Sequence, residues 1–597
     1  MNIALAQMEV IAKQPSKNFE TMKKMIQQAK DNHVDCIVFG ELVISGYLIG
    51  DTWFNDAFVS TCESYNDEIV KLADGIIIVW GNIATNLKKD CTHHSGRMAI
   101  YNCGFVAQNK TFVNRENGSS LPYIKHLLPN YRIFDDERYF VSGQQLSKQD
   151  MFSPFVVMVQ GQPQKVGLEV CEDLWDEHYQ SNPTQNWATQ NLDVLINVSS
   201  SPWSNNKEKA RVRHALNKSK RYQIKTFVYV NVVGMQNTGK NVVVFDGGSF
   251  ICNHNGEITT QSNDSFYQEL TLSHQMHKAI TNNKMMDAIV YAIKAFDQQM
   301  FQQSKKWIVG LSGGIDSTVS IALLSKALGS HRIIAVNMPS KYNQSISINN
   351  AKQTAKNLNI EYVEHSIEKL VEATKNTLSL NDSKEHEFIL ENVQARVRGH
   401  LLSTLAALRN GVIVNNGNKV ETALGYCTLY GDTIGALSPL GDCTKMQVFE
   451  LAKQLNEYFE NEIIPINLIP TETEHGLEFD FMPSAELKEN QQDPMKWGYH
   501  DYLIEKITEY PTYEIQDIIQ QVKTNNVIDS NLKKWLEIYN LTTYNDFIND
   551  LKWVLRQVEL GVFKRIQMPP IVLVSRGAFG SDLRENQGLT SLEIFDI

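Results

Sequence analysis

A glycine-rich turn between an apolar strand and a helix constrains the fold of this chain more than any other stretch. The sequence KKWIVGLSGGIDSTVSIALLSK covers Lys305–Lys326 and predicts a buried strand at Trp307–Leu311. Apolar residues recur at helical spacing from Ile315 onward, so the turn leads into an amphipathic helix. Free N–H groups and the positive end of a helix dipole bind phosphate at such a turn. The stretch therefore predicts a phosphate site in an α/β fold.

The residues of this loop suit phosphate groups and a divalent cation. Glycines let the backbone approach phosphates closely, and a carboxylate can hold magnesium on the same phosphates. The candidate phosphate ligands are Ser312, Gly313, Gly314, Ile315, Asp316 and Ser317. The stretch lacks the GxxxxGK[ST] pattern of a Walker A loop. SGGxDS resembles the pyrophosphate loop of the ATP pyrophosphatases, which adenylate a substrate; the alternative is a tight turn whose serine and aspartate only cap a helix.

Length, charge and cysteine content narrow the class of protein. A chain of 597 residues should hold at least two domains, each with its own core. The net charge of −11 argues against general binding to nucleic acid or to anionic membranes. The eight cysteines form no CxxC pair, which favours a reducing compartment. There is no signal-peptide pattern and no apolar run of about 18 residues, so we expect a cytoplasmic protein that acts on small molecules.

Three chemical groups stand out in the first half of the chain, which reads as strand-rich α/β. Glu41 follows an apolar strand, Lys125 lies in a stretch dense in aromatic and charged residues, and Cys171 lies between a strand and a helix. A helix N-terminus and a nearby ammonium favour the thiolate of such a cysteine, and a carboxylate supplies a general base. Taken singly, each residue also has an ordinary structural explanation. Cys171 could be a buried structural thiol, Glu41 a cap or a surface residue, and Lys125 a solvated lysine.

Four motifs, which follow one another along the chain, assign these three residues to one kind of site. GELVISGY, KHLLPNYRIFDDERYF, GLEVCEDLW and NVSSSPWSNNK resemble the motifs of nitrilase-like carbon–nitrogen hydrolases, and most closely those of glutaminase domains. Over residues 1–270 the resemblance implies an αββα sandwich. It implies that Cys171 attacks the glutamine amide, that Glu41 is the general base and that Lys125 stabilises the oxyanion. The implied glutamine ligands are Tyr131, Ser201 and Lys207, the last of them at the α-carboxylate.

The second half of the chain alternates strands with helices. From residue 332 to residue 415 this pattern predicts βαβ units and a doubly wound parallel sheet. Ligands bind beyond the carboxyl ends of such strands, so the phosphate loop and the NNGN stretch at 415–418 should share one edge. We expect a helical linker at residues 271–303 and a second domain at residues 304–597.

Seven ordered motifs in this half resemble those of the glutamine-dependent NAD⁺ synthetases. They are SGGIDS, MPSKYNQS, ENVQARVRG, GNKVETALGYCTLYGD, DCTK, PSAELKENQ and FKRIQMPP. With the first half, the resemblance covers nearly the whole chain. It implies that ATP adenylates the nicotinate carboxylate of deamido-NAD⁺, and that ammonia from glutamine then displaces AMP. It also implies a Mg²⁺ cofactor, a homo-oligomer and, because free ammonia escapes to solvent, an internal channel.

The resemblance assigns further site residues in the second half. Besides the phosphate loop, the implied ATP ligands are Asn416, Lys445 and Ser484. The implied magnesium ligands are Asp316 and Glu421. The implied ligands of deamido-NAD⁺ are Asn392, Arg396, Glu421, Tyr426 and Lys564. The FKRIQMPP motif would close over that substrate, with a basic surface turn as the alternative.

Three positions complicate this assignment. Asn416 stands where a threonine is common in the family and Val420 where a serine is common, which puts the ATP-binding role of that motif in question. Ser484 precedes a predicted helix, so it could serve only as an N-cap.

Two other functions fit parts of the pattern. A different amidotransferase could use the same adenylating chemistry on another carboxylate, but the superfamily does not share the motifs that follow Glu391. A catalytically silent binding protein could keep the fold. The complete set of candidate catalytic and metal-binding residues argues against a silent protein. The set consists of Glu41, Lys125, Cys171, Asp316 and Glu421.

Overall fold

The computed structural model describes residues 1–87, 92–145, 148–263, 265–277, 284–488, 491, 493–509, 513–591 and 593. Cys91, residues 278–283 of the expected linker and residues 489–490 of the PSAELKENQ motif lie outside the described residues. The chain separates into two compact units, Met1–Thr238 with Val243–Lys284, and Gly239–Val242 with Met285–Ile597. None of the helices in the described ranges is long and apolar enough to cross a membrane.

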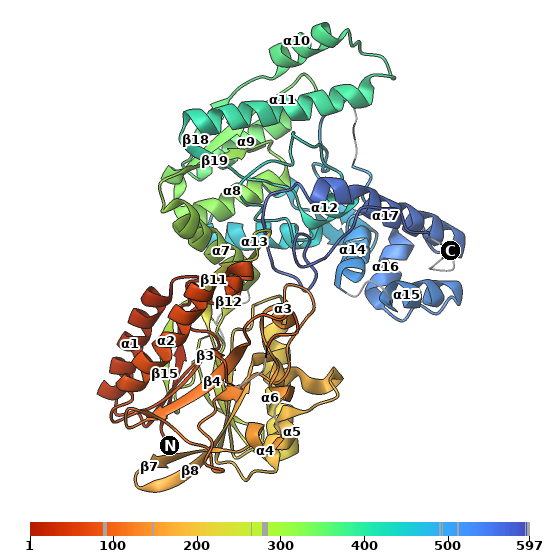
Figure 1. Cartoon of the computed structure of the whole chain (residues 1–597). Coiled ribbons are helices and arrows are strands. Elements are labelled where there is room, and N and C mark those ends of the chain that lie inside the picture. Colours follow the sequence, from red (N-terminus) through yellow and green to blue (C-terminus); the bar gives the residue numbers. More distant parts are fainter. Residues whose placement is uncertain are drawn as a thin grey trace. The chain divides into compact units, whose positions relative to one another are not determined.

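The first unit is a sandwich of two β-sheets with helices on its outer faces (Figure 1). In the described part of the chain, one sheet has the order β15-β1-β2-β3-β4-β5, with β6 beside β4. Its strands are β1 (Ile3–Gln7), β2 (Cys36–Phe39), β3 (Ile77–Thr85), β4 (Ile100–Gln108), β5 (Thr111–Phe112), β6 (Tyr123–Ile124) and β15 (Glu269–Leu272). The other sheet has the order β14-β13-β10-β9-β8-β7. Its strands are β7 (Phe155–Val159), β8 (Gln162–Val170), β9 (Val194–Ser199), β10 (Thr226–Asn231), β13 (Phe250–Asn253) and β14 (Ile258–Gln261).

Helices cover both outer faces, so the central strands are buried on two sides. Helix α2 packs on β3 of the first sheet and α6 packs on β10 of the second, while β3 and β9 meet between the sheets. The helices are α1 (Pro15–Asp31), α2 (Asp56–Leu72), α5 (Pro183–Ala188) and α6 (Lys207–Tyr222), with the short α3 (Asp136–Tyr139) and α4 (Lys148–Met151). Every residue of β2 and β9 is buried, which explains why these strands read as unbroken apolar runs. The αββα expectation is confirmed.

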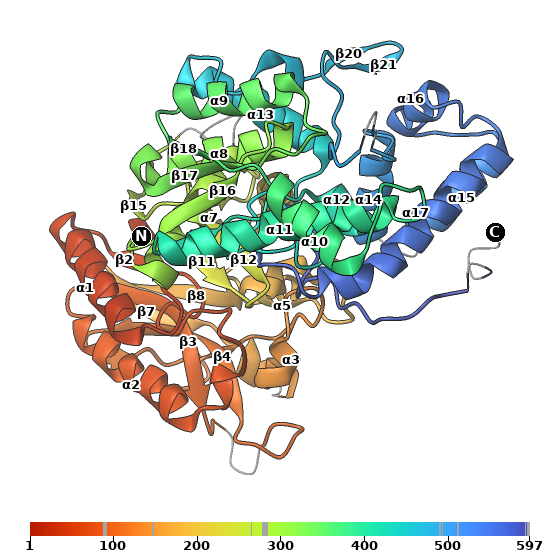
Figure 2. The ribbon, with the colours of Figure 1, turned by 90° about the horizontal axis from the view of Figure 1, so that it is seen from above.

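The second unit is built on a parallel sheet with the order β18-β17-β16-β19. Its strands are β16 (Lys306–Gly310), β17 (Ile333–Asn337), β18 (Glu361–Glu364) and β19 (Gly411–Ile413). Figure 2 shows α8 (Ile315–Leu328) and α9 (Ser345–Asn357) on one face of this sheet, and α11 (Glu387–Leu408) on the other. The predicted doubly wound sheet is confirmed.

The strand order reverses beside β16, because the chain passes through β17 and β18 before β19 returns to its other side. The loops after β16 and β19 therefore meet at one edge, which is the usual ligand site of such sheets. Asn416, after β19, donates through Nδ2 to the carbonyl of Gly310 at the end of β16, at 2.9 Å.

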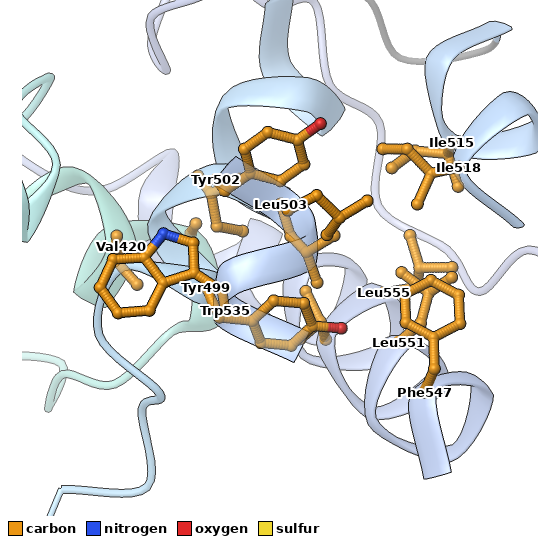
Figure 3. Close-up of a cluster of buried hydrophobic side chains, with 14 of the residues drawn as sticks. Val420, Tyr499, Tyr502, Leu503, Ile515, Ile518, Trp535, Phe547, Leu551 and Leu555 are labelled. Carbon is orange, nitrogen blue, oxygen red and sulfur yellow. The ribbon is translucent and has the colours of Figure 1, made fainter. Parts of the chain in front are cut away.

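A helical layer completes the second unit around a large apolar cluster (Figure 3). Tyr499 of α14, Trp535 of α16 and Leu551 of α17 meet in this cluster, and Val420 is fully buried in it. The remaining helices are α7 (Lys284–Phe301), α10 (Glu368–Leu378), α12 (Lys419–Leu424), α13 (Lys445–Phe459), α14 (Tyr499–Glu509), α15 (Tyr513–Lys523), α16 (Ser530–Ile538) and α17 (Tyr544–Arg565).

Short strands and irregular segments fill the rest of the chain. The strands are β11 (Val233–Asn237), β12 (Asn241–Asp246), β20 (Thr471–Thr473), β21 (Gly476–Glu478) and β22 (Ile571–Val572). The predicted helix after Ser484 is absent, since residues 482–488 are irregular. The hydroxyl of Ser484 instead accepts the backbone N–H of Glu486 at 3.2 Å, which fixes a turn.

Candidate functional site

Cys171 stands where β8 ends and a 3₁₀ turn, Cys171–His178, begins. Its φ of +43° is in the left-handed region, which costs a residue other than glycine about 1–2 kcal/mol, so the surrounding structure must hold it. The carboxylate of Asp173 does so, because it accepts the N–H groups of Val170 at 3.0 Å and Leu127 at 2.8 Å. The turn thus presents the Cys171 thiol at the carboxyl end of the strand.

Lys125 joins two buried carboxylates beside this turn. Its Nζ lies 2.8 Å from Oε1 of Glu41 and 2.7 Å from Oδ2 of Asp136. Burial lowers the pKa of Lys125, but the two carboxylates outweigh burial and raise it well above its ordinary value. The side chain is therefore a fixed ammonium. Glu41 is held in turn by Nδ2 of Asn102 at 2.7 Å and by the N–H of Ser200 at 2.9 Å.

The thiolate expected at Cys171 is wrong for the free protein. Burial raises the pKa of the Cys171 thiol, the charge of Glu41 raises it further, and the opposing effect of Lys125 is smaller. The thiol therefore keeps its proton at neutral pH and needs a base when it attacks. Glu41 is held by Lys125, Asn102 and Ser200 in a fixed position for that task.

The three candidate glutamine ligands differ in their surroundings. The hydroxyl of Tyr131 donates to the carboxylate of Glu172 at 3.1 Å, and burial raises the pKa of Glu172 to about 7. The N–H of Ser201 donates to Oδ1 of Asn231 at 2.8 Å.

Lys207 is the first residue of α6 and sits over the ring of Phe134. Within the described ranges its ammonium makes no ion pair and no hydrogen bond. Burial, and then the charge of Arg211, lower the pKa of Lys207 to about 8. Lys207 is thus a half-buried cation available to an anionic ligand.

Sequence reasoning missed the supporting residues of this site. Asp136 lies in the quoted FDDERYF stretch, and its other oxygen accepts the hydroxyl of Tyr47 at 2.6 Å. The many charged residues of that stretch were the only sequence signal that pointed to Asp136. Asn102 and Ser200 gave none, since an asparagine inside a strand and a serine after one are ordinary.

In the second unit, a cavity of about 600 Å³ opens at the carboxyl ends of β16, β17 and β19. The candidate residues that line it are Ser312, Gly314, Ile315, Asp316, Ser317, Asn392, Asn416, Glu421, Tyr426, Lys445, Ser484 and Lys564. Gly313 and Arg396 are not among its lining residues.

The phosphate loop requires a glycine at position 313. Its φ is +86°, and a Cβ there would lie 1.8 Å from the carbonyl oxygen of Ser347. The loop is closed by its own hydroxyls, since Ser317 and Thr318 donate to the carbonyl of Gly314 at 3.1 and 2.8 Å. The turn therefore approaches α9 more closely than any other residue type permits.

A buried lysine also joins two carboxylates in this cavity. Nζ of Lys445 lies 2.5 Å from Oδ2 of Asp316 and 3.5 Å from Oε1 of Glu421. Burial, and then the charge of Asp316, raise the pKa of Glu421 to about 8, although Lys445 opposes them. In the part of the chain that the structure describes, no group of three or more His, Cys, Asp or Glu side chains could hold a metal ion. Two carboxylates suit magnesium, which commonly takes one or two from the protein and the rest from phosphates and water.

The two departures from the family pattern have different surroundings. Val420 faces the apolar cluster of Figure 3 and is fully buried, so a hydroxyl there would not reach the cavity. Asn416 lines the cavity, and its Oδ1 is buried with no hydrogen-bond partner in the described part of the chain. The amide at 416 therefore offers a free acceptor.

The dinucleotide candidates are spread around the cavity wall. Asn392 donates to the carbonyl of Phe388 at 2.8 Å, and Gln491 donates to the hydroxyl of Tyr426 at 3.4 Å. Nζ of Lys564, in the last turn of α17, donates to the carbonyls of Gly425 and Cys427, both at 2.7 Å.

Arg396 is exposed and donates to the carbonyl of Leu429 at 3.3 Å. Arg398, two residues further along α11, lines the cavity instead. The sequence alone did not distinguish these two arginines.

Comparison with known proteins agrees with this division. A carbon–nitrogen hydrolase family model matches residues 2–276, and an NAD synthase family model matches residues 288–547. The glutamine-dependent NAD(+) synthetase of Acinetobacter baylyi is 30% identical over 511 residues, which cover 84% of this chain and 86% of that protein. The protein of the same name from a Synechocystis strain is 30% identical over 607 residues, with coverage of 98% and 97%.

A solved structure also matches most of the chain. The glutamine-dependent NAD⁺ synthetase of Acinetobacter baumannii, in complex with adenosine diphosphate, matches with a TM-score of 0.66 and 26% identity. The match covers 93% of this chain and 94% of that one. From its ordered motifs, its two sites and these relatives, the chain belongs to the family of glutamine-dependent NAD⁺ synthetases.

Proposed function

We propose that this chain makes NAD⁺ from deamido-NAD⁺, ATP and glutamine, with AMP, pyrophosphate and glutamate as the other products. One observation carries the proposal. This member of the family has both a Cys–Lys–Glu site and a cavity built on a phosphate loop. We assign the glutaminase to residues 1–270 and the ligase to residues 304–597.

In the glutaminase reaction the Sγ atom of Cys171 attacks the side-chain amide carbon of glutamine, and Glu41 takes the thiol proton. The fixed ammonium of Lys125 stabilises the oxyanion. Glu41 then gives the thiol proton to the amide nitrogen, so the intermediate collapses to a thioester, ammonia leaves and Glu41 is a carboxylate again. Glu41 then activates the water that hydrolyses the thioester. Tyr131 and Ser201 position the substrate, and the free ammonium of Lys207 binds its α-carboxylate.

In the ligase reaction a nicotinate carboxylate oxygen attacks the α-phosphorus of ATP, and pyrophosphate leaves. Adenylation is needed because a carboxylate oxygen is a poor leaving group, whereas AMP departs readily when ammonia attacks the carbonyl carbon. The loop at 312–317 binds the phosphates, and the ammonium of Lys445 neutralises their charge. The unpaired Oδ1 of Asn416 suits the amino group of adenine. Ser484 also lines the cavity.

We infer that Mg²⁺ binds with ATP at the carboxylates of Asp316 and Glu421, where it would neutralise charge on the departing pyrophosphate. Asn392, Arg396, Glu421, Tyr426 and Lys564 are our candidate ligands of the dinucleotide. We also propose a cytoplasmic location, which the free thiols of the seven described cysteines suit.

The test is NAD⁺ formation from deamido-NAD⁺, ATP and Mg²⁺, with glutamine or ammonium supplied in parallel. We expect product with either nitrogen source, and one AMP and one pyrophosphate for each NAD⁺. AMP release only with some other carboxylic acid would point to a different amidotransferase. No ATP cleavage with any acceptor would reject the proposal.

We further propose that the chain forms a homo-oligomer through α10 and α11. No residue of α10 is buried, and Leu378 and Leu408, near the ends of these helices, are 61% and 75% exposed. Exposed leucine side chains of this kind favour association. We expect Leu378→Asp/Leu408→Asp to sediment as a smaller species than the wild type, and Thr404→Asp, which adds a charge at an exposed polar position of α11, to sediment as the wild type does. Identical sedimentation of all three would reject this surface.

A further inference from the structure

Arg398 is a half-buried cation that lines the ligand cavity and has no anionic partner in the described part of the chain. Its Nε donates to the carbonyl of Met338 at 3.1 Å, and its Nη2 donates to Oδ1 of Asn343 at 3.3 Å. Within the described ranges no carboxylate lies within 4 Å of the guanidinium. Two of its five N–H donors are therefore used, and the others are available.

The energetics of this arrangement favour an anionic ligand. Burial lowers the pKa of Arg398 to about 10, and the acidic groups that oppose this effect, Glu486 first among them, act from a distance. A guanidinium remains charged even so, and a buried charge without a partner is costly. Phosphate oxygens match the planar fork of an arginine and would relieve that cost.

The contacts of Arg398 lead to the phosphate loop. Asn343 lies between β17 and α9, and the first turn of α9 places the carbonyl of Ser347 directly against Gly313 of that loop. The same Asn343 donates through Nδ2 to Oε2 of Glu486 at 2.7 Å. Arg398, Asn343 and Glu486 thus tie three segments together along the wall of the cavity next to the ATP loop.

We propose that Arg398 binds a phosphate group of ATP, as a ligand additional to the loop at 312–317 and to Lys445. This inference rests on the proposed function, because it takes ATP as the occupant of the cavity. A phosphate of the dinucleotide has the same chemistry. In the described part of the chain, however, the side chain of Arg398 hydrogen-bonds to the β17–α9 connection beside the ATP loop and to none of the candidate dinucleotide ligands.

The experiment is calorimetric titration of the full chain with Mg·ATP alone and with deamido-NAD⁺ alone. We expect Arg398→Gln, which keeps a hydrogen-bond donor but loses the charge, to weaken ATP binding on the order of 10- to 100-fold. Arg398→Lys, which keeps the charge but not the fork, should lie between it and the wild type. Arg409→Met is the matched control, since Arg409 follows the same helix, is exposed and pairs with Glu361. An unchanged circular dichroism spectrum and an unchanged melting temperature of the variants establish that they fold.

The outcomes separate this inference from the proposed function. Wild-type chain that binds no ATP would reject the proposed function and the inference with it. Wild-type ATP affinity in Arg398→Gln would overturn the inference alone. If Arg398→Gln binds deamido-NAD⁺ more weakly but ATP as the wild type does, the inference is also overturned, because Arg398 would then belong to the dinucleotide site.

Discussion

At the scale of single residues, the buried lysines of the two sites fall into two kinds. Lys125 and Lys445 each join two carboxylates, so their charge is fixed and their position is set by more than one bond. Lys207 has no such partner in the described part of the chain, and its pKa falls to about 8. Neighbouring carboxylates therefore decide which lysines are permanent parts of a site and which titrate near neutral pH.

The titration of Lys207 predicts the pH dependence of glutamine hydrolysis. Since its pKa in the free protein lies below the ordinary value, Lys207 is charged below about pH 8 and neutral above it. We expect kcat/KM for glutamine to fall as the pH rises through about 8, because the α-carboxylate loses its cation. Lys207→Arg should move this fall in kcat/KM, the alkaline limb of the pH profile, to higher pH, since arginine stays charged.

The pH profile of kcat/KM, followed by ammonia release, checks this prediction. A simple primary amide without an α-carboxylate serves as the control substrate and should show no such limb in the wild type. The same limb in Lys207→Arg would assign the titration to another group.

The ammonium of Lys445 lies against both carboxylates that we assign to magnesium, so the lysine and a metal ion should compete in the absence of ATP. Removing one partner of a buried ion cluster costs about 3–5 kcal/mol, so Lys445→Met should melt at a lower temperature than the wild type. Mn²⁺ without nucleotide should then raise the melting temperature of the variant more than that of the wild type. Asp316→Asn in the Lys445→Met background should abolish the difference. Equal Mn²⁺ shifts in wild type and variant would show that the lysine does not exclude the ion.

At the scale of elements, the apolar pattern predicted the central strands well and the surface helices less well. The strand predicted at Trp307–Leu311 is β16, Lys306–Gly310, because its apolar run is bounded by lysines and by the glycine-rich turn. Helix α2 was not predicted, although Asn55 caps it by accepting the N–H of Phe58 at 3.1 Å. The buried positions of α2, among them Val59, Cys62 and Ile69, do recur at helical spacing, but a buried polar residue, Asn66, interrupts the apolar pattern.

The turn between β16 and α8 gives a prediction at this scale. Gly313→Ala forces a Cβ onto the carbonyl of Ser347 in a left-handed conformation, which costs about 2 kcal/mol or more. Gly314→Ala is the matched comparison, because its Cβ would meet only the hydroxyl of Ser312, at 3.4 Å, without a positive φ. Thermal unfolding should show a larger loss of melting temperature for Gly313→Ala. Equal losses would mean that the contact with α9 does not constrain the loop.

At the scale of the whole molecule, the chain divides into two units, and each has its own core and its own charged site. The Cys171 site lies in the first unit, and all residues lining the cavity lie in the second. A defect in one site should therefore leave the chemistry of the other intact.

Cys171→Ala tests this independence. We expect the variant to lose glutamine-driven NAD⁺ synthesis by at least about 10³-fold, because no other nucleophile replaces the thiol. Ammonium-driven synthesis should stay within about twofold of the wild type, because ammonia reacts only at the ligase site. The two rates are measured on the same preparation. Loss of both would contradict the division of labour between the units.

The sequence by itself determined the fold class, the strands and the main chemical groups. Apolar runs report burial, and the SGGIDS turn reports a phosphate loop, because both depend on residues that are neighbours in the chain. The ordered motifs were sufficient to name Glu41, Lys125 and Cys171 as one site.

Only the tertiary structure decided what surrounds those groups. Asp136 beside Lys125, the protonated thiol of Cys171 and the free ammonium of Lys207 depend on contacts across the sandwich. The choice of Arg398 over Arg396 at the cavity depends on how α11 lies on its sheet. Burial and distance set these charges, and neither is a property of the local sequence.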